Sequence, residues 1–100
     1  MDKWSNNRLT VVGPKADVGQ SLKSKWYRRL GARHGEMMEN LRRRYVSIFE
    51  TDEPPLEPLR KLSRRWPRLV FLLDYEIESK RIKGILKAQT GRIASCQLEY

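Results

Sequence analysis

Residues 51–78 read TDEPPLEPLRKLSRRWPRLVFLLDYEIE, and two regular elements follow one another in this stretch. In its first half, apolar residues recur at helical spacing after two acidic residues and two prolines that suit a first turn. These apolar residues are Leu56, Leu59, Leu62 and Trp66. Pro67 ends the helix. After it, apolar residues occur at every second position, as in a strand with one buried face. One side of the second half consists of Leu69, Phe71, Leu73, Tyr75 and Ile77. The stretch therefore predicts a helix and a strand whose apolar faces share one core.

Further strands are expected on both sides of this unit. Alternating apolar residues and strand-forming residue types predict strands at 8–12, 45–50, 81–89 and 92–100. Gly84 interrupts the third of these and indicates a bulge or the close approach of another group. Thr90-Gly91 fits a two-residue hairpin turn, which makes the strands on either side of it antiparallel neighbours.

Two further helices are expected before residue 45. Apolar residues at successive i, i+4 positions predict a helix at 15–26, and these residues are Val18, Leu22 and Trp26. Gly31 and Gly35 interrupt any single helix in 27–44, so this segment is interpreted as a variable insert. Within the insert, one face of a short helix would consist of Met37, Met38 and Leu41.

The order of these elements predicts the fold class. Two strand-helix-strand passages in one antiparallel sheet, with the helices on a single face, indicate a ferredoxin-like α+β domain extended by a C-terminal hairpin. The alternative is a less regular α+β arrangement. One hundred residues are enough for a single domain with its own core, so residues 1–100 are expected to form one domain.

No pattern of catalytic or ligand-binding residues stands out. The chain contains neither a phosphate-binding glycine loop nor a nucleophile elbow. His34 and Cys96 are the only residues of their types, which excludes an ordinary zinc site made of nitrogen and sulfur ligands. Three acidic residues alternate along the strand from Leu69, and they are interpreted as a solvated face: Asp74, Glu76 and Glu78. We therefore expect a protein that is not an enzyme and has no metal and no cofactor.

Basic residues carry the strongest functional signal. Lys and Arg number 21 against 12 Asp and Glu, which gives a net charge of +9, and such an excess accompanies contact with nucleic acid or with an acidic protein. Several of these basic residues lie on the predicted helix in 51–78, on the face opposite its apolar stripe. They predict a cationic ridge that faces solvent. The candidate binding residues are Arg28, Arg29, Arg42, Arg43, Arg60, Lys61, Arg64, Arg65 and Arg68.

Two classes of partner fit this surface. DNA or RNA would be bound through phosphates, whereas an acidic protein surface would be bound through bidentate contacts from arginine to carboxylates. Pairing of exposed strand edges would give a homodimer, and the sequence does not indicate which edge is free.

A cytoplasmic location is expected. The polar N-terminal residues lack the apolar core of a signal peptide, and the longest apolar run, 69–73, is too short to cross a membrane. A single cysteine fits a reducing compartment.

Two parts of the chain, about residues 1–20 and 45–84, resemble the YubB-like ferredoxin-like domains of plasmids, phages and other mobile elements. The matching residues are Trp4-Ser5-Asn6-Asn7-Arg8-Leu9-Thr10-Val11-Val12-Gly13-Pro14, Asp17-Val18, Phe49-Glu50-Thr51, Pro54-Pro55, Leu62-Ser63, Trp66-Pro67 and Tyr75-Glu76. The chain departs from that family in its shorter, less aromatic insert and in the lack of a glycine-rich turn after Tyr75-Glu76. The resemblance implies a ferredoxin-like fold and a mobile-element setting, and it assigns no catalytic residue.

Overall fold

The structure is a computed structural model that describes residues 4–23, 35–41 and 44–100. Its elements, in chain order, are β1 (Ser5–Val12), α1 (Lys15–Lys23), β2 (Gly35–Leu41), β3 (Arg44–Thr51), α2 (Leu56–Arg65), β4 (Val70–Ile77), the 3₁₀ turn η2 (Glu78–Lys80), β5 (Ile82–Gln89) and β6 (Arg92–Glu99). The fold is therefore α+β, as predicted.

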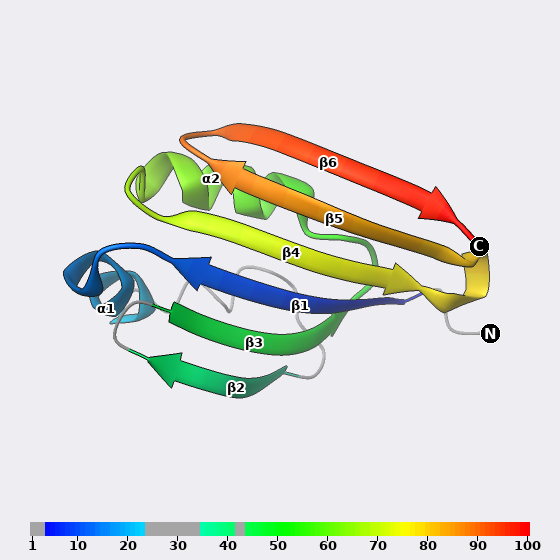
Figure 1. Ribbon diagram of the computed structural model, residues 1–100, viewed down its shortest axis with the longest axis horizontal. Helices are drawn as coiled ribbons and strands as arrows, with labels where there is room; N and C mark the ends of the chain where they lie inside the picture. The colour runs from blue at the N-terminus through cyan, green and yellow to red at the C-terminus, as the bar shows by residue number, and fades with distance from the viewer. Residues whose placement is uncertain (1–3, 24–34, 42–43) are drawn as a thin grey trace.

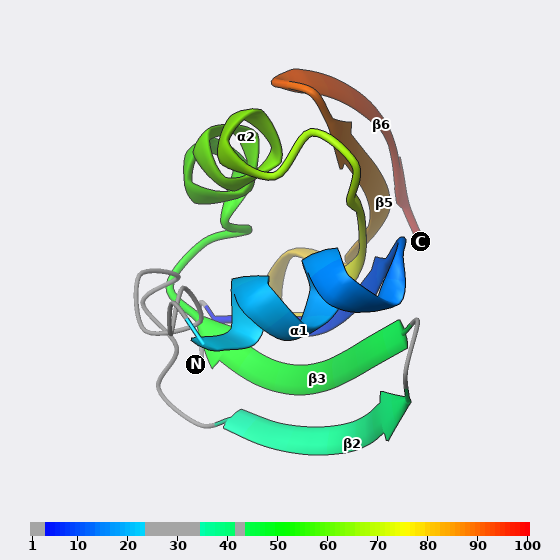
Figure 2. The same ribbon diagram turned by 90° about the vertical axis from the view of Figure 1, so that its left-hand side faces the viewer.

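One antiparallel sheet contains all six strands in the order β2-β3-β1-β4-β5-β6 (Figure 1). The two helices lie on the same face, and the sheet curls around them (Figure 2). α2 packs on β4, β5 and β6, whereas α1 packs on β3. The β-α-β-β-α-β order of the first six elements, with β1 between β3 and β4, is compatible with a ferredoxin-like fold.

The core lies between the helices and the covered face of the sheet. Its buried residues are Leu9, Val11, Val18, Tyr45, Phe49, Leu59, Leu62, Leu69, Phe71, Leu73, Tyr75, Leu86 and Ala88. All five alternating residues predicted to line one strand face between Leu69 and Ile77 are buried. Leu59 and Leu62 of the predicted helix are buried, while Leu56 and Trp66 pack against the same cluster half-buried. The shared core predicted from residues 51–78 is thus confirmed.

One expected element is wrong. Residues 35–41 form β2 at the edge of the sheet, where a short helix was expected from Met37, Met38 and Leu41. Glu, Met and Leu favour helices, but that preference amounts to a few tenths of a kcal/mol per residue, and hydrogen bonding to the outer edge of β3 outweighs it. The helix expected at 15–26 ends at Lys23 as described, and residues 24–26 lie outside the described residues.

The expected hairpin after β5 is confirmed. Thr90 and Gly91 both have positive φ, 51° and 79°, as a type I′ turn requires, and β5 pairs with β6 without a register shift.

Candidate functional site

The antiparallel topology brings the end of β1, the starts of β3 and β4, and the β5–β6 turn together at one end of the molecule. Val12, at the end of β1, lies opposite both Arg44 of β3 and Val70 of β4 in the pairing register. Gln89 and Arg92, on either side of the β5–β6 turn, occupy the same end. This end is on the left in Figure 1 and faces the viewer in Figure 2, where the start of α1 and the end of α2 also lie.

Exposed cations gather at this end from every one of these segments. They are Lys15, Arg44, Arg64, Arg65, Arg68 and Arg92, which we call the basic end. Among the described residues of these segments, the acidic side chain is Asp17, whose Oδ1 lies 3.8 Å from Nη1 of Arg68. Cations therefore outnumber carboxylates in the described part of this end, and such a surface attracts polyanions.

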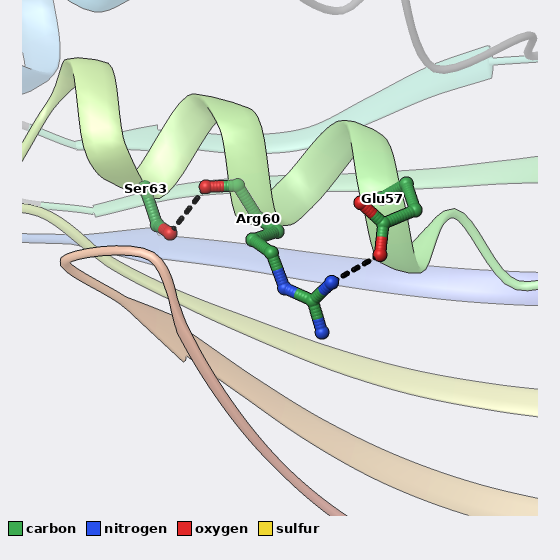
Figure 3. Close-up of polar contacts among 3 residues, drawn as sticks. All are labelled: Glu57, Arg60 and Ser63. Carbon is green, nitrogen blue, oxygen red and sulfur yellow. Dashed lines mark hydrogen bonds and ion pairs between the residues drawn. The ribbon is translucent and has the colours of Figure 1, made fainter.

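Ser63 fixes the position of the last turn of α2. Its buried hydroxyl accepts a hydrogen bond from the Gly91 amide at 2.9 Å. The same hydroxyl donates a hydrogen bond to the Arg60 carbonyl at 2.8 Å (Figure 3). Arg64 then lies against the β5–β6 turn, since a Cβ atom on Gly91 would be 2.6 Å from its Cγ. The helix and the hairpin therefore present their cations as one unit.

The helix ridge predicted from the sequence is present in part. Lys61, Arg64, Arg65 and Arg68 are exposed. Arg60 is different, because its side chain is about one third exposed at 34% and its guanidinium pairs with the Glu57 carboxylate (Figure 3). An exposed ion pair of this kind adds little stability. It does, however, engage the Arg60 guanidinium with a carboxylate of its own helix. Four predicted binding residues lie outside the residues whose side chains are described: Arg28, Arg29, Arg42 and Arg43.

Lys15, Arg44 and Arg92 were not predicted as site residues. Arg44 directly follows Arg42 and Arg43, whereas Lys15 and Arg92 are single cations next to turns. All three lie at the ends of predicted strands or close to them. Those ends lie together at one end of the sheet, but this follows only from the strand order.

The opposite end of the molecule is rich in acidic residues. They are Glu50, Asp52, Glu53, Glu76, Glu78 and Glu99, which we call the acidic end. Among the described residues, three cations lie beside them: Lys80 and Arg81 in and after η2, and Lys83, which stands opposite Glu76 in the β4–β5 register. In the part of the chain that the structure describes, charge is thus distributed unevenly along the strand direction.

The uncovered face of the sheet is a second distinctive surface. Ile48, Leu72, Ile85 and Leu98 are exposed on it, with Ile85 and Leu98 more than half exposed at 59% and 57%. A shallow hollow of about 510 Å³ lies among Arg8, Ile48, Asp74, Ile85 and Leu98. Across the part of the chain that the structure describes, no group of three His, Cys, Asp or Glu side chains could hold a metal ion.

Two tyrosines have perturbed acidity. Burial, and to a lesser degree the charge of Cys96, raises the pKa of Tyr75 above 10.0. The hydrogen bond that the Tyr100 hydroxyl donates to the Glu76 carboxylate raises the pKa of Tyr100, because it favours the protonated phenol. Both hydroxyls lie away from the basic end.

Comparisons with known proteins add no family. No protein family model, curated protein or solved structure matches this chain. Each helix in the described part is too short and too polar to span a membrane.

Proposed function

We propose that this chain is a non-enzymatic nucleic-acid-binding protein that holds the phosphate backbone at its basic end. The observation that carries the proposal is the convergence of exposed cations from α1, α2, β3, the α2–β4 connection and the β5–β6 turn. Arginine forks and lysine ammonium groups are the side chains that bind phosphates.

Duplex is the form of nucleic acid that this surface suits. Single-stranded binding relies on exposed aromatic rings that stack on bases. At the basic end, Tyr45 and Phe71 are buried, and Trp66 is half-buried with the Arg65 guanidinium 6.0 Å from its ring centroid. The described aromatic residues of this end therefore serve packing, and its exposed cations are the groups that would contact the phosphate backbone.

The wider setting belongs to the same proposal. A ferredoxin-like framework, the YubB-like family, a mobile-element origin and a cytoplasmic location all agree with a small protein that meets nucleic acid. The strand order and the resemblance in the sequence support this setting.

The test is equilibrium binding to labelled duplex and single-stranded DNA and RNA over about 50 to 300 mM salt. If about five phosphates are neutralised, the log-log salt slope on duplex DNA is about −4 to −5. Lys15→Glu/Arg65→Glu reverses two cations of the basic end, and Lys80→Glu/Lys83→Glu, the matched control, makes the same change in net charge outside it.

The expected result is a loss of more than about tenfold in duplex affinity for the first variant and a change of less than about threefold for the second. Equal losses in both variants would show that binding follows net charge alone and would overturn the site. Absence of binding to all four ligands would overturn the function and leave an acidic protein surface as the partner to test.

A further inference from the structure

The outer edge of β6 is open. β6 pairs with β5 over its whole length, from Arg92 to Glu99, and in the described residues no strand lies on its other side. Apart from Ile93, every residue of β6 is exposed. Its sequence, RIASCQLE, contains no proline and no lysine, and its two charged residues, Arg92 and Glu99, stand at the ends of the strand. The opposite edge strand, β2, has a register shift between Met37 and Glu39, so β6 is the regular edge.

The direction of the free backbone groups follows from one hydrogen bond. The Tyr100 amide donates to the Arg81 carbonyl at 2.8 Å, in continuation of the β5–β6 register. Backbone groups alternate between the two sides of an antiparallel strand. The residues of β6 whose amides and carbonyls point away from β5 are therefore Ile93, Ser95, Gln97 and Glu99.

We propose that β6 pairs antiparallel with β6 of a second copy of this chain, around a two-fold axis perpendicular to the sheet. An exposed strand edge accepts another strand through its main chain, and an isologous contact closes as a dimer. The result is one continuous sheet of two sets of six strands. With this axis, the helix-covered faces of both copies lie on the same side of the joined sheet. A side chain on the covered face is therefore paired with a side chain on the covered face of the second copy, and the same holds for the open face.

One register satisfies all the free groups. With Cys96 opposite Cys96 of the second copy, Ile93 pairs with Glu99 and Ser95 pairs with Gln97, so that all four outward residues of each copy are hydrogen-bonded. A shift of two residues one way places Glu99 opposite Gly91, whose amide already donates to Ser63. The opposite shift moves Ile93 beyond the end of β6.

The side chains of this register are compatible. Leu98, which is 57% exposed, gains Ala94 of the second copy as a neighbour on the open face. Ser95 and Gln97 form a polar pair on the covered face, and no two like charges stand opposite each other. Cys96 and its copy form a pair without backbone hydrogen bonds, whose Cα atoms are about 4.5 Å apart, within reach of a disulfide.

This dimer meets the proposed nucleic-acid contact only at Arg92, which lies opposite Tyr100 of the second copy. Because the two copies of β6 run in opposite directions, the two basic ends point away from each other. Dimerisation is therefore not needed to complete either cationic surface, and each proposal can fail without the other.

Sedimentation of the full chain at about 100 μM tests the interface, with Ser95→Pro as the variant. Because the Ser95 amide points outward, proline removes a dimer hydrogen bond and keeps the β5–β6 ladder. We expect a dimer for the wild type and for Ser95→Thr, and a monomer with an unchanged circular dichroism spectrum for Ser95→Pro. A monomeric wild type, or an equally dimeric Ser95→Pro, would overturn the proposal.

Cross-linking tests the register without relying on that proline. Under copper-phenanthroline oxidation, Cys96 should link two wild-type chains by a disulfide. Ala94→Cys/Cys96→Ser places the thiol opposite Leu98 of the other copy, and its yield of covalent dimer should fall at least about fivefold. Equal yields from both positions would contradict the register and indicate random collisions.

Discussion

At the residue scale, Gly84 is required by the ring of Tyr75. The two residues lie opposite each other in the β4–β5 register, and a Cβ atom on Gly84 would lie 2.1 Å from Cζ of the ring. The ring crosses β5, and its hydroxyl donates to Oε1 of Gln97 in β6 at 2.7 Å. The sequence left a bulge or a close approach open at Gly84. The close approach is confirmed, and the β4–β5 pairing is continuous there.

Gly84→Ala should therefore destabilise the protein by about 1–3 kcal/mol, because the buried ring must move and its hydrogen bond to Gln97 is strained. Urea unfolding measures this change. Gly19→Ala is the matched control: it lies exposed within α1 with no atom within 4 Å of the added Cβ, and it should stabilise by about 0.5–1 kcal/mol. A Gly84→Ala protein as stable as the wild type would show that the ring does not cross β5.

Tyr75 also predicts how stability depends on alkaline pH. Its pKa in the folded protein is raised by burial and by Cys96, relative to 10.0 in the unfolded chain. The folded state therefore binds the Tyr75 proton more tightly than the unfolded state does. The stability that this difference contributes is complete below pH 10 and is lost as the pH rises through the folded pKa. In urea titrations between about pH 9 and pH 11, Tyr75→Phe should lose less stability than the wild type. Lysine titration is common to both proteins, so equal losses would contradict the prediction.

At the scale of elements, the β5–β6 turn holds a residue in an unfavourable conformation. Thr90 has φ 51°, and β-branched residues are uncommon at positive φ, whereas Asn-Gly is the preferred pair of a type I′ turn. Thr90→Asn should raise the free energy of unfolding by roughly 0.5–1 kcal/mol. Gly91→Ala should lower it, because its φ is 79° and the added Cβ would meet Arg64. Thermal unfolding distinguishes the two, and a destabilised Thr90→Asn would contradict the expected preference of this turn.

The elements also show what the sequence can predict. In residues 51–78 the apolar residues repeat regularly over enough positions to predict both α2 and β4 from this segment alone. β2 is different, because its Glu and Met residues favour a helix and its strand exists through pairing with β3. The site divides in the same way. Arg64, Arg65 and Arg68 are close in sequence and were predicted together, whereas Lys15 and Arg92 join them only through the strand order.

At the scale of the whole molecule, separation of charge along the strands has an energetic consequence. The basic end places exposed cations close together, and like charges at a surface repel each other more at low ionic strength. The acidic end holds Lys80, Arg81 and Lys83 near carboxylates, where a positive charge is expected to be favourable. A cation therefore has opposite effects on stability at the two ends, although each contributes equally to the net charge of +9.

Arg92→Glu and Lys80→Glu test this difference, since they change the net charge by the same amount. At about 20 mM salt, Arg92→Glu should raise the thermal midpoint by about 2 to 4 °C, and Lys80→Glu should lower it. Both shifts should shrink at about 500 mM salt because exposed charges are then screened. Shifts of the same sign would mean that the two ends do not differ in potential. If the basic end is a binding surface, Arg92→Glu should weaken duplex binding while it stabilises the fold. Both effects have one cause, because the positive potential that makes the cations of this end repel each other is also what attracts phosphates.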